Sequence, residues 1–185
     1  VNLKRTAEAI VLLEAAIKDE PTRGLAYAIL AYAQESTSAE EKTILENYAL
    51  AVKHDPKNKT AWYYYGKFIG RFKTRDVQTY MEFVTAIKNY RSHFPEDIWG
   101  RGSLAWAYLE LAELDSPTWL EVAKQQCEQV LAIDGDDHWS HYLLGRLYLL
   151  QKKPRLALLE AQLAFEIEPL SRYLELIDRA KLYTN

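Results

Sequence analysis

Residues 134–169 carry the clearest hydrophobic pattern in the chain, and it predicts two helices joined by a turn. One face of the first helix holds residues at offsets of 0, 3, 4 and 7, namely His141, Leu144, Gly145 and Tyr148. The second helix carries a narrow stripe of small residues, Ala157, Ala161 and Ala164. Pro169 ends this helix because proline lacks an N–H and clashes with the preceding turn. A glycine facing small residues predicts a tightly packed hairpin.

The same pattern recurs upstream. Turn residues stand at spacings of 34 to 40, namely Gly135, Pro95, Pro56 and Pro21 counted back from Pro169. Each precedes a helix whose anchor residues begin six positions later, as Trp62, Tyr65, Gly66 and Ile69 do after Pro56. The spacing resembles the W-x2-L-G-x2-Y … A-x3-F … P pattern of the tetratricopeptide repeat (TPR) family. Arg101 and His141 replace the leading Trp in two modules, and two modules carry five or six extra residues.

This resemblance implies an all-α, right-handed superhelical solenoid of TPR-like helix hairpins, with about ten helices. We expect one solenoid domain over residues 1–185. It would open with a half module at 3–19, continue with hairpins at 24–55, 58–93, 97–133 and 137–168, and close with a capping helix at 170–183. Ser38 and Glu41 predict a capping box that starts a helix near Ala39. Pro117 and Pro154 have the sequence context of first-turn prolines.

Composition narrows the function classes. A net charge of −3 gives no bulk attraction to nucleic acid, and no apolar run approaches the ~20 residues of a membrane span. The single cysteine excludes an internal disulfide framework, and a buried structural thiol is favoured over a reactive one at Cys127. A cytoplasmic location is favoured over other compartments, although the sequence does not identify the compartment.

The resemblance also implies where a partner would bind, because the first helix of each TPR hairpin lines the concave side of the stack. The face opposite the anchor residues holds three of the five tryptophans, several tyrosines and three cations. Our candidate partner-binding residues are Tyr32, Tyr63, Lys67, Arg71, Trp99, Trp106, Trp139, Tyr142 and Arg146. Aromatic and arginine side chains bind peptides well. The alternative for Trp99 and Trp106 is simple packing between modules.

These residues favour a non-catalytic scaffold that holds a peptide or helix of a partner protein in its concave groove. Some TPR proteins grip an acidic tail with a clamp of Lys, Asn and Arg, but only Lys67 is cationic at the matching positions here. The alternative is a scaffold that self-associates through its terminal helices, because the chain starts in mid-module and its first helix would expose an apolar stripe.

A third possibility is an enzyme or carrier that uses the acidic and imidazole groups near residue 135. Asp134, Asp136, Asp137, His138 and His141 lie within eight residues and could in principle hold a metal. However, Trp139 replaces the glycine that an EF-hand loop requires, and an acidic helix N-terminus explains the carboxylates. No catalytic motif is present, so we expect no enzyme activity, no cofactor and no metal.

Overall fold

The computed structural model describes residues 3–71 and 75–184, and within them the regular structure is entirely α-helical. The chain forms two compact units, Val1–Arg75 and Asp76–Asn185. The all-α class predicted from the sequence is therefore confirmed. Within the described part, no helix has both the length and the apolar character that crossing a membrane demands.

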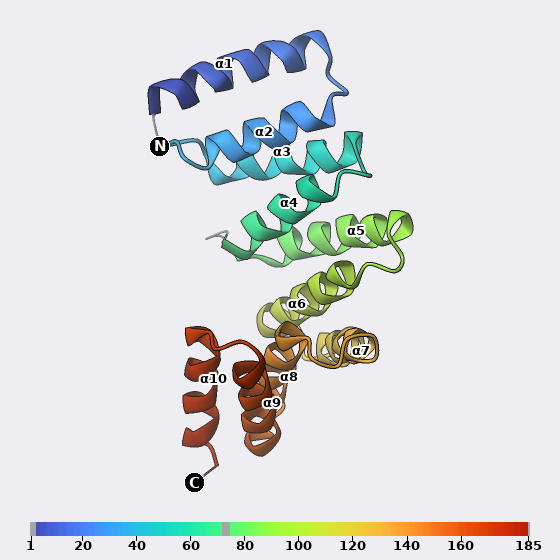
Figure 1. Ribbon diagram of the computed structural model, residues 1–185, viewed down its shortest axis with the longest axis vertical. Helices are drawn as coiled ribbons and strands as arrows, with labels where there is room; N and C mark the ends of the chain where they lie inside the picture. The colour runs from blue at the N-terminus through green and yellow to red at the C-terminus, as the bar shows by residue number, and fades with distance from the viewer. Residues whose placement is uncertain (1–2, 72–74, 185) are drawn as a thin grey trace. The chain divides into compact units, whose positions relative to one another are not determined.

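The first unit contains four helices: α1 Leu3–Asp19, α2 Gly24–Gln34, α3 Glu41–His54 and α4 Lys59–Arg71. Figure 1 shows α2 and α3 side by side as a hairpin, with α1 against α2. Gly24 lets the start of α2 approach the end of α3, since a Cβ there would lie 2.7 Å from the Ala51 carbonyl oxygen. The core of this unit is aromatic, and the Tyr48 ring lies 5.7 Å from Phe68 and 6.4 Å from Tyr65.

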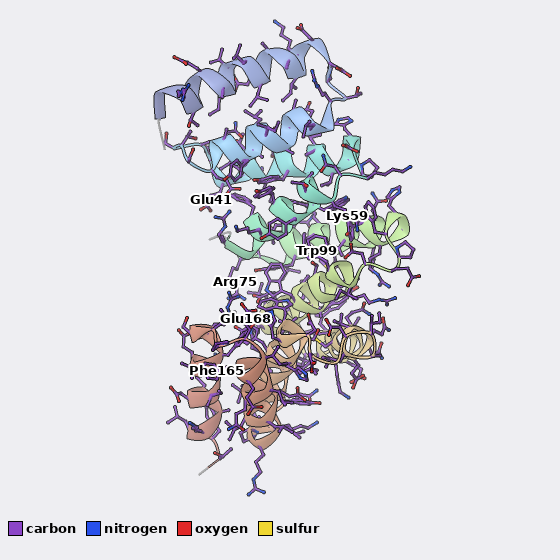
Figure 2. The ribbon with its side chains drawn as sticks, viewed as in Figure 1. Glu41, Lys59, Arg75, Trp99, Phe165 and Glu168 are labelled. Carbon is purple, nitrogen blue, oxygen red and sulfur yellow. The ribbon has the colours of Figure 1, made fainter. Side chains whose placement is uncertain are left out.

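The second unit contains six helices: α5 Val77–His93, α6 Ile98–Leu114, α7 Trp119–Leu131, α8 His138–Leu150, α9 Pro154–Ile167 and α10 Ser171–Leu182. Consecutive helices pack together along this unit (Figure 1). Helix α6 is buried on most of its circumference, as its apolar sequence predicts. Phe165, labelled on α9 in Figure 2, packs beside a small core cluster of Ala161, Leu176 and Ile177.

The glycine and the alanine stripe expected in the hairpin at 137–168 meet as predicted. Ala157, Ala161 and Ala164 are fully buried. A Cβ on Gly145 would lie 3.3 Å from the Ala157 carbonyl oxygen and 2.9 Å from the Leu176 side chain. The small residues therefore set the close approach of α8 to α9, and α10 covers the same place.

Two predicted helix starts are wrong. Helix α3 begins at Glu41 with Glu40 as its N-cap, and no side chain caps it, so the Ser38 box is not formed. Instead Thr37 bonds locally, accepting from the Ala39 N–H at 3.2 Å and donating to the Gln34 carbonyl at 2.8 Å. Pro117 precedes α7 rather than opening it, because the N-cap is Thr118. Pro154 does open α9.

Pro21, Pro56, Pro95 and Pro169 each follow the end of a helix, as the sequence predicts. The hairpin expected at 58–93 has its first helix in the first unit and its second helix in the second unit, with residues 72–74 outside the described part. Its pairing, and the single domain over 1–185, stay predictions.

Candidate functional site

A cleft of about 720 Å³ opens in the first unit between α1, α2 and α4. Its wall combines small, aromatic and charged side chains: Arg5, Thr6, Ala9, Tyr32, Ala33, Glu35, Ser36, Tyr64, Lys67 and Arg71. Three of the nine candidate residues, Tyr32, Lys67 and Arg71, thus lie around one cavity. The helix periodicity explains this, because Lys67 and Arg71 are four residues apart on one face of α4.

The charges around the cleft are unbalanced. Arg5, Lys67 and Arg71 contribute three cations, whereas Glu35 contributes the one carboxylate of the described lining. Within the described residues, neither Arg5 nor Lys67 forms an ion pair, and the Lys67 ammonium lies 5.8 Å from the centroid of the exposed Tyr63 ring. The cleft therefore attracts anionic groups.

Glu35 is already held by two partners. Its carboxylate pairs with the exposed Arg71 guanidinium on one side, and its Oε1 accepts a hydrogen bond from the buried Tyr48 hydroxyl at 2.5 Å on the other. Burial and this bond raise the pKa of Tyr48, so the hydroxyl keeps its proton and donates. Glu35 is therefore largely neutralised, and the cleft retains a net positive charge.

Tyrosine rings form a continuous surface beside these cations. The rings of Tyr32 and Tyr64 lie 5.0 Å apart, and those of Tyr63 and Tyr64 lie 5.5 Å apart. Tyr32 is 56% exposed and Tyr63 is 49% exposed, although both are large amphipathic rings. Exposed rings of this kind supply rigid contact area at low entropic cost.

In the second unit, two of the candidate tryptophans contact neighbouring aromatic rings. Trp99, labelled in the first turn of α6 in Figure 2, meets Tyr90 edge-on at 5.0 Å. Trp106 meets Tyr80 at 5.5 Å and Phe83 at 5.7 Å, also edge-on. Both indoles are only half-buried, so each packs against α5 and still has area exposed to solvent.

The candidates on α8 form a connected group with α10 and α6. Trp139 and Tyr142 lie 5.2 Å apart, and Arg172 of α10 lies 5.5 Å from the Trp139 ring. Arg146 forms ion pairs with α6, because its guanidinium lies 2.9 Å from Glu110 and 2.5 Å from Glu113. Since this pair is largely buried, Arg146 has a structural role whether or not it also contacts a partner.

The acidic and imidazole groups near residue 135 have local partners. Asp137 caps α8 by accepting the Ser140 N–H at 2.7 Å. His138 lies 2.6 Å from the Tyr173 hydroxyl and 2.7 Å from Glu168, which Figure 2 labels near the end of α9. His141 lies 2.7 Å from Glu160. Among residues with described side chains, no three such groups are gathered as metal ligands.

Cys127 is buried on α7, as the sequence predicts for a structural thiol. Burial raises the pKa of this thiol, which leaves little thiolate to react.

Sequence reasoning missed the contribution of α1 to the cleft. Arg5, Thr6 and Ala9 come from that helix, whereas the resemblance implied partner contacts only from the first helix of each hairpin. Tyr64 and Glu35 were also absent from the candidate set. Glu35 lies on the helix face opposite the anchor residues of its module. The helical period could therefore have placed it beside Tyr32. The partner-binding role of all these residues stays a prediction.

No protein-family model matches this chain, and no curated protein matches it. Solved structures do match. YrrB, described as a TPR protein with an unusual peptide-binding site, aligns with a TM-score of 0.68 at 16% identity, over 97% of this chain and 84% of its own. TTC0263, a thermophilic TPR protein of Thermus thermophilus, gives 0.62 at 21% identity, over 98% and 92%. Pseudomonas aeruginosa pilF gives 0.64 at 21%, over 98% and 78%. The chain therefore has the TPR fold, which confirms the resemblance seen in its repeats.

Proposed function

We propose that this TPR-fold chain is a non-catalytic protein-interaction scaffold that binds a peptide of a partner in the cleft between α1, α2 and α4. The observation that carries the proposal is the cleft itself, about 720 Å³ lined by tyrosines and an excess of cations. Concave sites that combine aromatic surface with a few placed charges are typical of ligand binding. The peptide-binding site named for YrrB, a protein of the same fold, is consistent with this use.

The cleft chemistry specifies the partner segment further. Arg71 and Lys67 lie on α4, and Arg5 lies on α1. A segment with two or more carboxylates beside an apolar or aromatic residue would pair with these cations and pack on Tyr32. Three cations are too few for the phosphate contacts of a nucleic-acid interface, and the chain as a whole carries a charge of −3.

A crosslinking capture from the source cell tests the proposal. Wild type is compared with Tyr32→Ala/Lys67→Glu, which removes one exposed ring and reverses one cleft charge. We expect the variant to lose a specific partner, with affinity reduced roughly tenfold or more. Lys42→Glu is the matched control, since Lys42 is an exposed lysine of α3 outside the cleft lining.

Arg146 is left unchanged in this design, because its loss would disturb the ion pairs that join α8 to α6. Equal helical content and equal midpoints of thermal unfolding in all three proteins establish that the substitutions act on the surface. If the variant captures every protein that wild type captures, the cleft is not the binding site.

A second candidate function is self-association, and α1 supplies the observation that favours it. Val11 and Leu12 are 64% and 71% exposed on this helix, more than is usual for adjacent aliphatic residues. A second copy could cover them. Light scattering over a concentration series distinguishes a monomer from an oligomer. A strict monomer at the highest concentration would rule out self-association.

A further inference from the structure

Two arginine side chains of the second unit converge on one face of α7. Arg91 of α5 donates from Nη1 to Gln126 Oε1 at 3.4 Å, and Arg101 of α6 donates from Nη1 to Gln129 Oε1 at 2.5 Å. Gln126 and Gln129 are three residues apart on α7, so they point to the same side of the helix. Two guanidinium groups are therefore held near each other against neutral amides.

The described residues do not neutralise these two charges. Neither arginine forms an ion pair there, and the Nε donors of both are buried without an acceptor. Glu128, a carboxylate on α7, pairs with Lys124 at 3.2 Å. Burial, and then the charge of Arg101, lower the pKa of Arg91. Adjacent, partly buried like charges destabilise a fold unless an anion compensates them, and unsatisfied buried donors call for a partner.

The sequence around Arg101 departs from the repeat pattern. Arg101 occupies the place of the leading Trp in its repeat, where an apolar anchor is expected. Gly100 beside it makes room for Arg91, because a Cβ at Gly100 would lie 2.8 Å from the Arg91 Cγ. The local sequence thus accommodates one guanidinium and places a second beside it.

We propose that Arg91 and Arg101 form a binding site for a dianionic oxyanion of the phosphate class. Guanidinium groups present paired N–H donors that match the oxygens of phosphate, and a dianion neutralises both charges at once. The site lies wholly within the second unit, so it is separate from the cleft of the first unit and does not depend on the function proposed for that cleft. A free phosphate ion and a phosphate monoester on a partner protein share this chemistry.

Thermal unfolding with and without inorganic phosphate, at constant ionic strength set with chloride, tests the proposal. We compare wild type with Arg91→Gln and Arg101→Gln. Arg155→Gln is the control, since Arg155 is exposed on α9 and has no ion pair among the described residues. Wild type and the control are expected to rise in Tm, saturably, by about 3–6 °C when phosphate is at roughly ten times Kd. Both test variants are expected to show a clearly smaller saturable rise than wild type.

Phosphate also stabilises proteins by exclusion from their surfaces, and it could bind the cations of the cleft. Those effects are shared by all four proteins, so the comparison between variants removes them. A saturable rise of equal size in wild type and both test variants would overturn the proposal, as would its absence from wild type. Repeating the titration with O-phosphoserine distinguishes free phosphate from a phosphate monoester. Tighter binding of O-phosphoserine than of inorganic phosphate assigns the site to a phosphorylated partner.

Discussion

Gly24 and Gly102 show how the same residue type serves different purposes in this fold. A Cβ on Gly24 would lie 2.7 Å from the Ala51 carbonyl oxygen and 2.8 Å from the Asp55 nitrogen, which are backbone atoms that cannot rotate away. A Cβ on Gly102 would meet only the Trp139 Cδ1 at 3.7 Å, an ordinary contact. Only the first glycine is required by packing.

Substituting the two glycines should therefore have opposite effects. We expect Gly24→Ala to reduce the free energy of unfolding by about 1–3 kcal/mol, because α2 must move away from α3. Gly102→Ala should raise it by up to about 1 kcal/mol, because alanine favours the helix interior. Urea unfolding measures both, and a stabilising Gly24→Ala would show that the α2–α3 contact is looser than described.

Arg146 was expected to bind a partner, but its ion pairs with α6 give it a structural role. Its partner Glu110 is only 4% exposed, so the carboxylate depends on nearby charge for its stability. We expect Arg146→Met to lower the free energy of unfolding by about 3 kcal/mol, measured by urea unfolding. Lys124→Met is the control and should leave that free energy nearly unchanged, because the Lys124 and Glu128 side chains keep 30% and 53% of their surface in contact with solvent. If Arg146→Met and Lys124→Met lower the free energy of unfolding by similar amounts, Arg146 does not have this structural role.

At the scale of elements, side-chain caps fix where several helices begin. Asp76, Asp97 and Asp137 each accept a backbone N–H in the first turn of α5, α6 and α8. We expect Asp137→Ala to destabilise the protein by about 1 kcal/mol, measured by urea unfolding. Asp136→Ala is the control, because Asp136 lies in the preceding turn and is exposed. Added zinc or calcium should not change the result, and a metal-dependent loss would revive the metal-site hypothesis.

The existence and order of the helices were predictable from the sequence. The prolines mark where helices end, and the period of the apolar residues marks their buried faces. Pairings in space were harder. Arg146 was expected to face a partner, and the helical angle alone does not show that it meets Glu110 of α6. The Ser38 box is not formed because α3 begins at Glu41, which makes Glu41 the first helical residue and not the third residue that such a box requires. The α1 side of the cleft depended on tertiary contact and left no periodic signal.

At the scale of the molecule, the chain has two compact units, each with its own buried residues. Repeat folds are stabilised mainly by contacts between neighbouring helices. We therefore expect residues 76–185, expressed alone, to keep their helical content and unfold cooperatively in circular dichroism. A fragment without a cooperative transition would show that the second unit depends on the first.

If a partner peptide occupies the cleft of the first unit, site-specific photo-crosslinking from a cleft residue will capture it. The photoreactive residue p-benzoylphenylalanine replaces Tyr32 in the cleft or Glu46 on the exposed side of α3, and cells are irradiated. We expect a discrete adduct from position 32, none from position 46, and loss of the adduct when Lys67→Glu is added. An adduct from position 46 alone, equal adducts from both positions, or none from position 32 would contradict the claim.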